Sequence, residues 1–449
     1  MADVPDSLFT TDAMRAVFTD RARIARMLEF EAALAQAEAT VGVIPQDAAD
    51  AIVRQCDSAA YDAAAISGAV HTAGNLAIPL VAQLTKKVGV SDPGAKGYVH
   101  WGATSQDLID TGLVLQLRDA FALIDADVDR LAAALAARAR QHADTVLAGR
   151  TWLQQALPLT LGVKLAGFVS ALDRHRERLA AARTRALVVQ FGGAVGTLAS
   201  LHDQGLAVAE RLAQQLSLRA PEMPWHSQRD RMCEVASVLG MLVATLGKLA
   251  RDFALLAQTE VDEAREPAAT GRGGSSTMPQ KRNPVGASIA LAAATRVPGL
   301  VATMLHAALA EHERGLGNWP AEWETLPEIA LLTAGALAAM IEVVEGLDVD
   351  ERRMRANLDI TRGLVFAEAV QTALAPKIGR DAAHSLVAGA CRRAVAEDRH
   401  LRDILESETD VMRHLDAQTL GRLFDPHGYL GSAHAFIARA LAQRPVSAA

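Results

Sequence analysis

Residues 229–256, RDRMCEVASVLGMLVATLGKLARDFALL, decide the fold of this 449-residue chain. Apolar side chains recur every three or four residues along the stretch, at Met232, Val235, Leu239, Leu242, Leu246, Leu249, Phe253 and Leu256. This spacing is typical of an α-helix with one continuous apolar face. About thirty residues at 1.5 Å each would form a helix of roughly 45 Å. Helices of ordinary domains are much shorter, so we expect a bundle of long helices.

Four more segments show the helical spacing, and they predict long helices from residue 113 onward and over about 159–186, 284–312 and 324–345. The segments at 159 and 284 begin with a proline at or near the first helical position, where proline is tolerated. Alanine and leucine dominate and aromatic residues make up 4% of the chain, which favours helix over strand. We therefore expect an all-α protein.

The predicted bundle divides the chain into three parts. Residues 1–112 form an N-terminal helical domain, residues 113–350 the central bundle domain, and residues 351–449 a C-terminal helical domain. Long helices that are apolar on more than one face predict neighbours from other chains, and hence a homo-oligomer. The alternative, an elongated monomer, would leave large apolar patches exposed.

Composition favours small-molecule chemistry in a reducing compartment. The net charge of -7 comes without a basic block, which argues against nucleic acid or an anionic membrane as a partner. The three cysteines, Cys56, Cys233 and Cys391, are too few and too scattered for a disulfide framework or a zinc site. The acidic N-terminus lacks the features of a signal peptide, and apolar runs such as 329–341 are shorter than the ~20 residues that span a bilayer. We expect a mature cytoplasmic protein.

The most irregular stretch is GRGGSSTMPQKRNPVGA, residues 271–287, between two predicted long helices. Its glycines supply backbone freedom and exposed N–H groups. Ser275 and Ser276 supply hydroxyls, and Lys281 and Arg282 supply positive charge at the start of a helix, where anions are favoured. The segment predicts a carboxylate-binding loop with a hydroxyl at its centre. A solvated connector is the alternative, although a plain linker has no need for Met278 and two prolines among charged residues.

Three other polar clusters have both a functional and a structural interpretation. YVHWGATSQDLIDTG (98–112) brings His100, Thr104 and Ser105 to a helix start, where they would bind a carboxylate. Alternatively, Thr104 or Ser105 together with Asp107 simply caps the helix. GRTWLQQALP (149–158) and HERGLGNWPAEWETLPE (312–328) are either parts of a site or polar surface. The glycines of FGGAVGT (191–197) lack the spacing and the βαβ context of a dinucleotide loop, so they indicate close packing.

The chain resembles the fumarase/aspartase superfamily along its whole length. The signature GSSxMPxKxNP of that superfamily is matched at residues 274–284, and the TSQD (104–107) and GRT (149–151) clusters occur in the order and spacing of the family. The resemblance implies three helical domains and a homotetramer whose active sites are each assembled from three subunits. The segments GRTWLQ, GYVHWGATSQD, VVQFGGAVGTLA, PWHSQRDR and EWETLPE are similar to a lactone-forming branch that acts on muconate-type tricarboxylates.

Two positions depart from the usual pattern of the superfamily. Most of its lyases carry a histidine after GRT and a glutamate seven positions beyond the signature lysine, and the two form an acid/base dyad. Trp152 and Ser288 stand at these positions here. Lactonisation within one substrate uses a carboxylate that is already ionised at neutral pH, so the nucleophile needs no base and the reverse reaction needs no acid. The departures therefore favour an intramolecular lyase over an adenylosuccinate-type or other fumarate-releasing lyase. A non-catalytic crystallin-like role is disfavoured because Ser275 and Lys281 are present.

The resemblance assigns Ser275 as the proton-transferring residue and Lys281 as the residue that stabilises the developing charge. It also implies a substrate-binding set made of His100, Thr104, Ser105, Arg150, Trp152, Gln154, Ser276, Met278, Asn283 and Arg314. We expect no cofactor and no metal, and a small polycarboxylate as the substrate.

Overall fold

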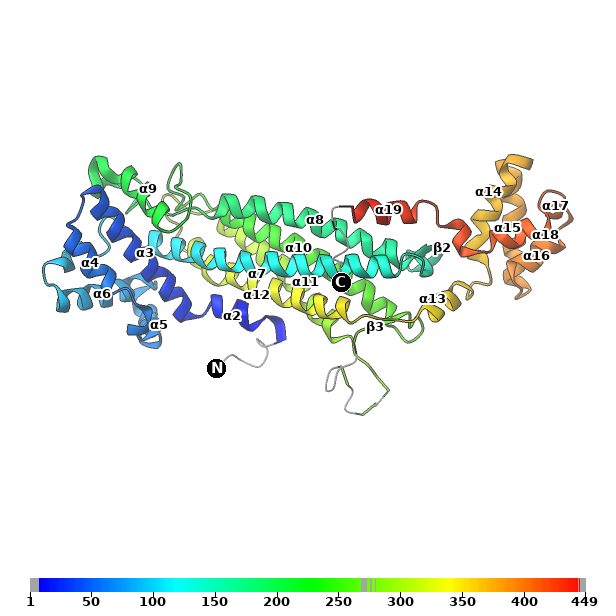
Figure 1. Ribbon diagram of the computed structural model, residues 1–449, viewed down its shortest axis with the longest axis horizontal. Coiled ribbons are helices and arrows are strands. Elements are labelled where there is room, and N and C mark those ends of the chain that lie inside the picture. The colour runs from blue at the N-terminus through cyan, green and yellow to red at the C-terminus, as the bar shows by residue number, and fades with distance from the viewer. Residues whose placement is uncertain (1–7, 268–272, 275–276, 279, 443, 445–449) are drawn as a thin grey trace. The chain divides into compact units, whose positions relative to one another are not determined.

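The computed structural model describes residues 8–267, 273–274, 277–278, 280–442 and 444 (Figure 1). The chain forms two compact units, each built from three segments of sequence. Unit 1 comprises residues 1–128, 175–247 and 289–338, and unit 2 comprises residues 129–174, 248–288 and 339–449. Five long helices contribute residues to both units: α7 (Ser105–Gln141), α8 (Leu161–Ala186), α10 (Asp230–Leu256), α11 (Val285–Ala307) and α12 (Asn318–Glu345).

Unit 1 also contains a lobe of shorter helices that pack on α3 (Figure 1). Its elements are α2 (Asp12–Val17), α3 (Asp20–Val41), α4 (Gln46–Arg54), η1 (Ser58–Ala60), α5 (Ala63–Ala73), α6 (Ala77–Ser91), η2 (Ala95–Tyr98), η3 (Ala199–Gln204) and α9 (Gly205–Gln215). The Thr19 hydroxyl caps α3 by accepting from the N–H of Ala22, and Gly42 ends the helix in a left-handed conformation (φ 88°). Buried Met27, Leu34 and other apolar residues of α3 form the core of the lobe with α4, α6 and α9.

Unit 2 holds a second helical lobe near the C-terminal end of the chain (Figure 1). Its elements are α13 (Glu351–Leu358), η4 (Leu364–Phe366), α14 (Ala367–Ile378), α15 (Arg380–Ala396), α16 (Leu401–Ser407), α17 (Thr409–Met412), α18 (Ala417–Leu423) and η5 (Pro426–Tyr429). Helix α19 (Ala433–Ala440) follows η5 and, among the described residues, contributes none to the core of this lobe. Val370, Leu374, Leu401 and Leu405 are fully buried in its core. Helices α14, α15 and α16 pack against one another around this core.

The structure confirms the predicted long helices but moves several of their ends. Helix α12 begins at Asn318 rather than at residue 324, because the proline at position 320 falls in the first turn, where a missing N–H is tolerated. Helix α11 ends at Ala307 rather than at residue 312, and the Asn318 side chain donates to the carbonyl of His306 at 3.1 Å near that end.

Two small antiparallel sheets depart from the all-helical expectation without changing the class of the fold. Strands β1 (Val146–Thr151) and β2 (Gln154–Thr160) form a hairpin, and β3 (Ala264–Arg265) pairs with β4 (Asp348–Val349). Pro158, which the sequence analysis placed at a helix start, lies in β2 opposite Ala148. The GRTWLQQALP cluster is therefore a hairpin rather than an irregular loop. The remainder of the described chain is helical or irregular, and the all-α class is confirmed.

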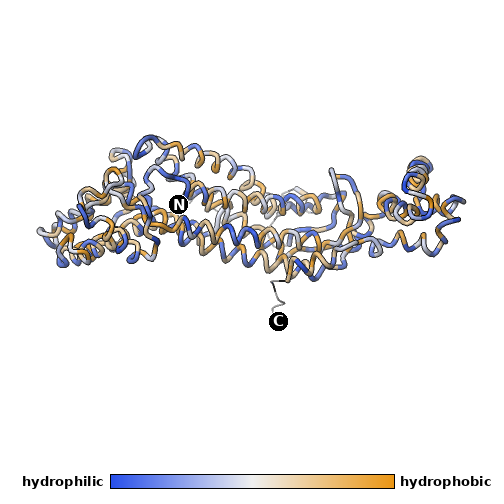
Figure 2. Tube along the Cα trace, turned by 90° about the horizontal axis from the view of Figure 1, so that it is seen from above, coloured by the Kyte–Doolittle hydropathy of each residue, from blue (hydrophilic) through white to orange (hydrophobic). Residues whose placement is uncertain are grey.

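Helices α10, α11 and α12 are long and apolar enough, by length and composition alone, to cross a membrane. The uncharged runs within these helices are shorter than the apolar windows, which also contain charged residues, so the sequence-based expectation underestimated their apolar length. The apolar windows of α10 and α12 are 61% and 78% buried within the protein, whereas that of α11 is only 28% buried. Figure 2 shows apolar residues recurring along the coils of the long helices with polar residues between them. Helix α11 therefore keeps apolar surface for which the described chain provides no cover.

Candidate active site

The described site residues predicted from the sequence fall into two groups. His100, Thr104, Ser105 and Arg314 belong to unit 1. The second group belongs to unit 2 and comprises Arg150, Trp152, Gln154, Met278, Lys281 and Asn283. Ser275 and Ser276 lie outside the described residues. Each group makes its own set of contacts within its unit.

In unit 1, His100 is paired with a buried carboxylate. The Oε1 atom of Glu31 on α3 lies 2.5 Å from Nδ1 of His100, and the Glu31 side chain is 1% exposed. Burial acts to lower the pKa of His100, but the attraction and hydrogen bond of Glu31 outweigh it and raise the pKa above its ordinary value. The contact with Glu31 therefore favours the charged form of His100. The sequence analysis assigned no role to Glu31.

The start of α7 is capped by Asp107. Its Oδ2 accepts from the backbone N–H of Thr104 at 3.0 Å and from that of Gly193 at 2.9 Å, and its Oδ1 accepts from the N–H of Gly192 at 3.0 Å. Nε2 of His226 lies 2.6 Å from the same Oδ1. The predicted capping role thus falls to a carboxylate and to backbone groups. Among the described residues, the Thr104 side chain makes no hydrogen bond, which leaves its hydroxyl available to a ligand.

The glycines of the FGGAVGT segment serve this cap as well as close packing. A Cβ on Gly192 would lie 2.7 Å from Cβ of Pro224, and Gly193 adopts a φ of 67° that favours glycine. Their N–H groups both point at Asp107. The close packing expected from the sequence is present, together with an anion-binding turn that is filled by the protein's own carboxylate.

Gln106 connects the start of α7 to Arg314. The Nε atom of Arg314 donates to Oε1 of Gln106 at 2.9 Å, and an Arg314 terminal nitrogen donates to the carbonyl of Ala194 at 3.1 Å. The amide nitrogen of Gln106 donates to Asp110 at 3.1 Å and to the carbonyl of His226 at 2.8 Å. The structure thereby brings Arg314 next to the TSQD cluster, although 208 residues separate Arg314 from Gln106.

A buried ion network lies one helical turn further along α7. Arg229 donates to Asp110 at 2.7 Å and to Glu322 at 2.5 Å, and all three side chains are 1% exposed. Trp319 Nε1 donates to Asp110 at 2.9 Å. Burial works against the charge of Arg229, but the two carboxylates outweigh it and raise its pKa. The network ties α7 and α12 to the residue that precedes α10 within unit 1, and it was not predicted from the sequence.

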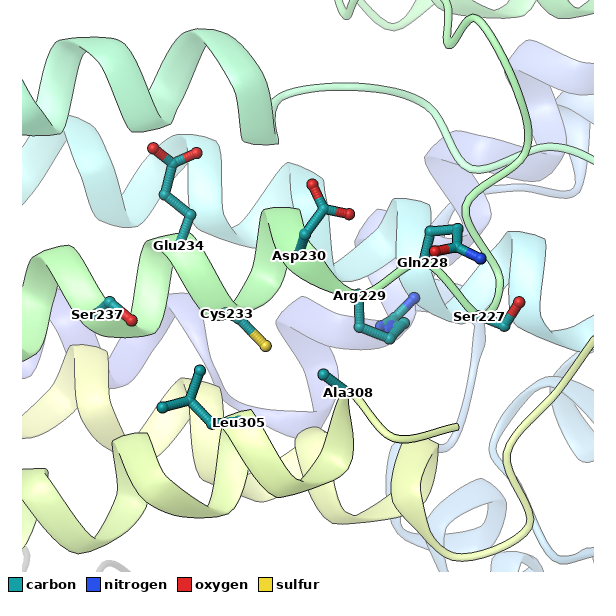
Figure 3. A pocket seen from close by; sticks show the side chains of 9 residues that line it. All are labelled: Ser227, Gln228, Arg229, Asp230, Cys233, Glu234, Ser237, Leu305 and Ala308. Carbon is teal, nitrogen blue, oxygen red and sulfur yellow. The ribbon is translucent and has the colours of Figure 1, made fainter. Parts of the chain in front are cut away.

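A cavity of about 420 Å³ opens beside the start of α10 (Figure 3). It is lined by Ser227, Gln228, Arg229, Asp230, Cys233, Glu234, Ser237, Leu305 and Ala308. No predicted site residue is among these lining residues. The cavity is therefore distinct from the residues predicted to form the site.

In unit 2, the β1–β2 hairpin presents Trp152 at its tip. Trp152 and Leu153 form the two-residue turn, with φ values of 51° and 63°, between the paired residues Thr151 and Gln154. The indole of Trp152 is 98% exposed. Turns of this kind favour asparagine and glycine at both positions, so two large apolar residues in a left-handed conformation are unusual. The hairpin therefore presents the indole to solvent in the described chain.

Arg150 of β1 already has a partner. Its guanidinium makes two hydrogen bonds to the fully buried Glu263, at 2.6 and 3.0 Å, and Asn357 also donates to Glu263 at 2.8 Å. This bidentate pair fixes the hairpin to the segment that leads into the signature loop. The proposed contact of Arg150 with a substrate carboxylate remains a prediction, and in this structure Arg150 anchors the hairpin.

The neck of the signature loop is closed by its backbone. The N–H of Asn283 donates to the carbonyl of Gly273 at 2.8 Å, and the N–H of Lys281 donates to the carbonyl of Met278 at 3.0 Å. Gly273 has a φ of 64°, and a Cβ there would lie 2.6 Å from the carbonyl oxygen of Asn283. A glycine is therefore required at position 273. The closed neck brings the two ends of the loop together, with Lys281 exposed at its C-terminal side.

The start of α11 is occupied by a carboxylate of the protein. Glu266 accepts from the N–H groups of Gly286 and Ala287 at 2.9 and 2.8 Å. Arg282 donates to the carbonyl of Glu266 at 2.8 Å. The sequence analysis expected this helix start to favour a bound anion, and Glu266 fills that position instead. Ser288, which stands where most of the lyases carry glutamate, is exposed in the first turn.

Comparisons with known proteins show the family to which the chain belongs. The family model described as "Lyase" matches residues 8–299, and the model described as "Adenylosuccinate lyase C-terminus" matches residues 363–440. The 3-carboxy-cis,cis-muconate cycloisomerase of Pseudomonas aeruginosa is 57% identical over 99% of this chain and 98% of its own length.

Two solved structures are similar along the whole chain. The 3-carboxy-cis,cis-muconate lactonizing enzyme of Pseudomonas putida aligns with a TM-score of 0.93 at 54% identity, over 98% of each chain. The β-carboxy-cis,cis-muconate cycloisomerase of Acinetobacter calcoaceticus aligns with a TM-score of 0.92 at 46% identity, over 98% of this chain and 99% of its own.

Proposed function

This chain belongs to the fumarase/aspartase superfamily of lyases, and from that premise we propose that it catalyses the lactonisation of 3-carboxy-cis,cis-muconate to 4-carboxymuconolactone. The reaction is an intramolecular addition, so the enzyme is a cycloisomerase. This activity would serve the degradation of protocatechuate in the cytoplasm.

The observation that carries the proposal is the absence of both halves of the acid/base dyad. Trp152 stands at the exposed tip of the hairpin, and Ser288 stands in the first turn of α11. Neither side chain is a general acid or base at neutral pH. A reaction that eliminates an amine would lack its proton donor. A reaction whose nucleophile is an ionised carboxylate of the substrate needs neither half of the dyad.

The chemistry then requires one proton transfer. A carboxylate oxygen of the substrate forms a C–O bond to the conjugated alkene, and the alkene electron pair moves into the neighbouring carboxylate to give an enolate-like dianion. The Ser275 hydroxyl donates its proton to the carbon, which completes the lactone and leaves a serine alkoxide that is reprotonated from solvent. Stabilisation of this alkoxide and of the dianion requires fixed positive charge and N–H donors. Lys281 and Asn283, at the closed neck of the loop, are the residues that we assign to this role.

The remaining predicted residues would hold the carboxylates of the substrate. Arg314 is fixed by Gln106, and the Thr104 hydroxyl is left available by the Asp107 cap. These two residues would supply a cation and a hydroxyl donor to the substrate. The same proposal includes His100, Ser105, Arg150, Trp152, Gln154, Ser276 and Met278 as substrate contacts.

We propose that the active enzyme is a homotetramer with sites shared between subunits, and that its chain divides into the three helical domains 1–112, 113–350 and 351–449. The apolar surface left on α11 and the exposed Trp152 both support an assembly with other copies of the chain. Light scattering on the purified protein should then give a mass about four times the 47.5 kDa of one chain. A mass of one chain would contradict the proposed assembly.

The test of the activity is a panel of three substrates, with turnover followed by ultraviolet absorbance. 3-Carboxy-cis,cis-muconate should be consumed, while adenylosuccinate and argininosuccinate should not. Turnover of either succinate compound alone would favour the second candidate, a fumarate-releasing lyase. The product of the first reaction should be identified as a lactone by NMR.

A further inference from the structure

The contact between Glu31 and His100 joins two segments of unit 1 that are far apart in sequence. Glu31 lies in the middle of α3, and His100 lies in the turn between η2 and α7. The Glu31 carboxylate is 1% exposed, yet only one of its oxygens has a hydrogen bond within the described chain, and that bond is the 2.5 Å contact to Nδ1 of His100. A buried carboxylate with so few partners is costly unless a charge faces it.

The imidazole is held so that one edge faces inward and the other outward. His100 adopts a φ of 59°, a left-handed conformation that is uncommon for a residue with a side chain. Nδ1 is taken by Glu31. Nε2 has no hydrogen bond in the described part of the protein and is not sealed from solvent, and the side chain is 15% exposed. Because the two nitrogens lie on opposite sides of the ring, Nε2 points away from the buried carboxylate.

The other ionisable groups near Glu31 have raised pKa values, which favours their neutral forms. Glu38, two turns further along α3, is fully buried and has no hydrogen-bond partner for either oxygen within the described chain. Burial and the charge of Glu31 raise the pKa of Glu38 to about 9, so this side chain is neutral at neutral pH. Burial, followed by the charge of Glu31, likewise raises the pKa of the Cys56 thiol, and the Tyr61 hydroxyl also has a raised pKa.

Within the described part of the chain, Asp107 also acts on the imidazole and favours its protonated form. Asp107 is engaged with the start of α7 and with His226. Among the described residues, Glu31 is the acidic side chain in direct contact with His100.

We propose that Glu31 is a positioning residue, which holds His100 as an imidazolium whose Nε2–H is presented to a carboxylate of the anionic substrate. This inference rests on the proposed function, because it takes His100 as a substrate contact. A charge-assisted hydrogen bond from an imidazolium to a carboxylate is stronger than a neutral one. Glu31 acts through His100 and does not touch the substrate.

The test is Glu31→Gln, measured as KM and kcat from pH 5.5 to 8.5. Glutamine keeps the shape and a hydrogen bond but removes the charge, so burial is no longer outweighed by Glu31 and the pKa of His100 should fall. KM should then rise by about 10- to 100-fold at pH 8 and by much less at pH 5.5, where the free imidazole is protonated without help. An effect of Glu31→Gln that is equal at every pH, or no effect, would overturn the proposal.

Two further variants separate positioning from structure. In a His100→Gln background, Glu31→Gln should cause no additional rise in KM, because the cation through which it acts is gone. Glu38→Gln removes the neighbouring buried carboxyl on the same helix, and it should leave KM unchanged because that carboxyl carries no charge. If Glu31→Gln does not fold, Glu31→Asp keeps the charge with a shorter reach, and a KM for this variant equal to the wild-type value would count against the proposal.

The pairing is also measurable without turnover. Imidazole ¹⁵N shifts, assigned by comparison with His100→Gln, should show His100 protonated at pH 7.5 in the wild type and neutral in Glu31→Gln. A wild type that does not consume 3-carboxy-cis,cis-muconate would refute the proposed function, and these shifts would still decide the protonation of His100. A neutral His100 in the wild type would refute the pairing alone.

Discussion

The buried carboxyl of Glu38 makes the stability of the protein depend on pH in a way that one substitution should abolish. Glu38 is inaccessible to solvent, and neither of its oxygens has a hydrogen bond within the described residues. Burial, and then the charge of Glu31, raise its pKa from 4.5 to about 9. The folded state therefore keeps a proton that the unfolded chain releases above pH 4.5.

The sign and the size follow from proton linkage. Because the folded state binds more protons, the contribution of Glu38 to stability is fully present below pH 4.5 and is lost as the pH rises toward 9. One proton of difference changes the free energy of unfolding by about 1.4 kcal/mol per pH unit. Between pH 6 and pH 8, the wild type should thus lose about 2.7 kcal/mol through this group alone. Glu38→Gln carries no titrating carboxyl and should not lose it.

The assay is urea unfolding at pH 6, 7 and 8, with the protein concentration held constant because the assembly is linked to folding. The stability of Glu38→Gln relative to the wild type should increase by about 1.4 kcal/mol per pH unit. Glu210→Gln, at an exposed position on α9, is the matched control and should follow the wild type at every pH. Parallel curves for Glu38→Gln and the wild type would refute the reasoning, because they would show that Glu38 has the same proton occupancy in both states.

Two further substitutions test the hairpin and the buried network. Trp152→His should lower kcat/KM for lactonisation by about tenfold or more, because we propose that the indole contacts the substrate. Stability should not change, since the indole is exposed in the folded chain. Unchanged lactonisation and substrate scope would remove the support for our account of the missing dyad. Arg229→Leu should reduce the free energy of unfolding by about 3–5 kcal/mol, since it leaves Asp110 and Glu322 buried without their cation. Arg211→Leu on the surface of α9 is its control, and equal urea midpoints for the two variants would contradict the assigned role of Arg229.

The long helices were predictable because their apolar spacing persists over many turns. Helices α7, α8, α10, α11 and α12 all occur where the spacing indicated them, and their ends moved only where a proline or a side-chain cap decided the boundary. The β1–β2 hairpin was not predictable in the same way. Its turn residues are Trp152 and Leu153 rather than the asparagine and glycine that mark such turns. Tertiary contacts such as the Arg150–Glu263 pair hold the turn in place.

The candidate site was only partly readable from the sequence. Local motifs pointed to Thr104 and Arg314, but the residues that hold them come from distant segments, as with Gln106 and Arg314. Charged residues on long helices usually face solvent, so the buried network around Arg229 could not be predicted from the spacing of its residues. A signal did exist for Glu31 and Glu38, which fall seven residues apart among the apolar positions of α3. Charged side chains within an apolar stripe predict buried partners.

The account depends most on a single proton transfer by Ser275 in a site without an acid/base dyad. The most direct test is the turnover of 3-carboxy-cis,cis-muconate by Ser275→Ala, followed by ultraviolet absorbance, in protein whose circular dichroism and assembly match the wild type. The account predicts a fall in kcat of about 10²- to 10⁴-fold, as expected when a positioned proton donor is removed. Turnover by Ser275→Ala at a rate close to that of the wild type would contradict it.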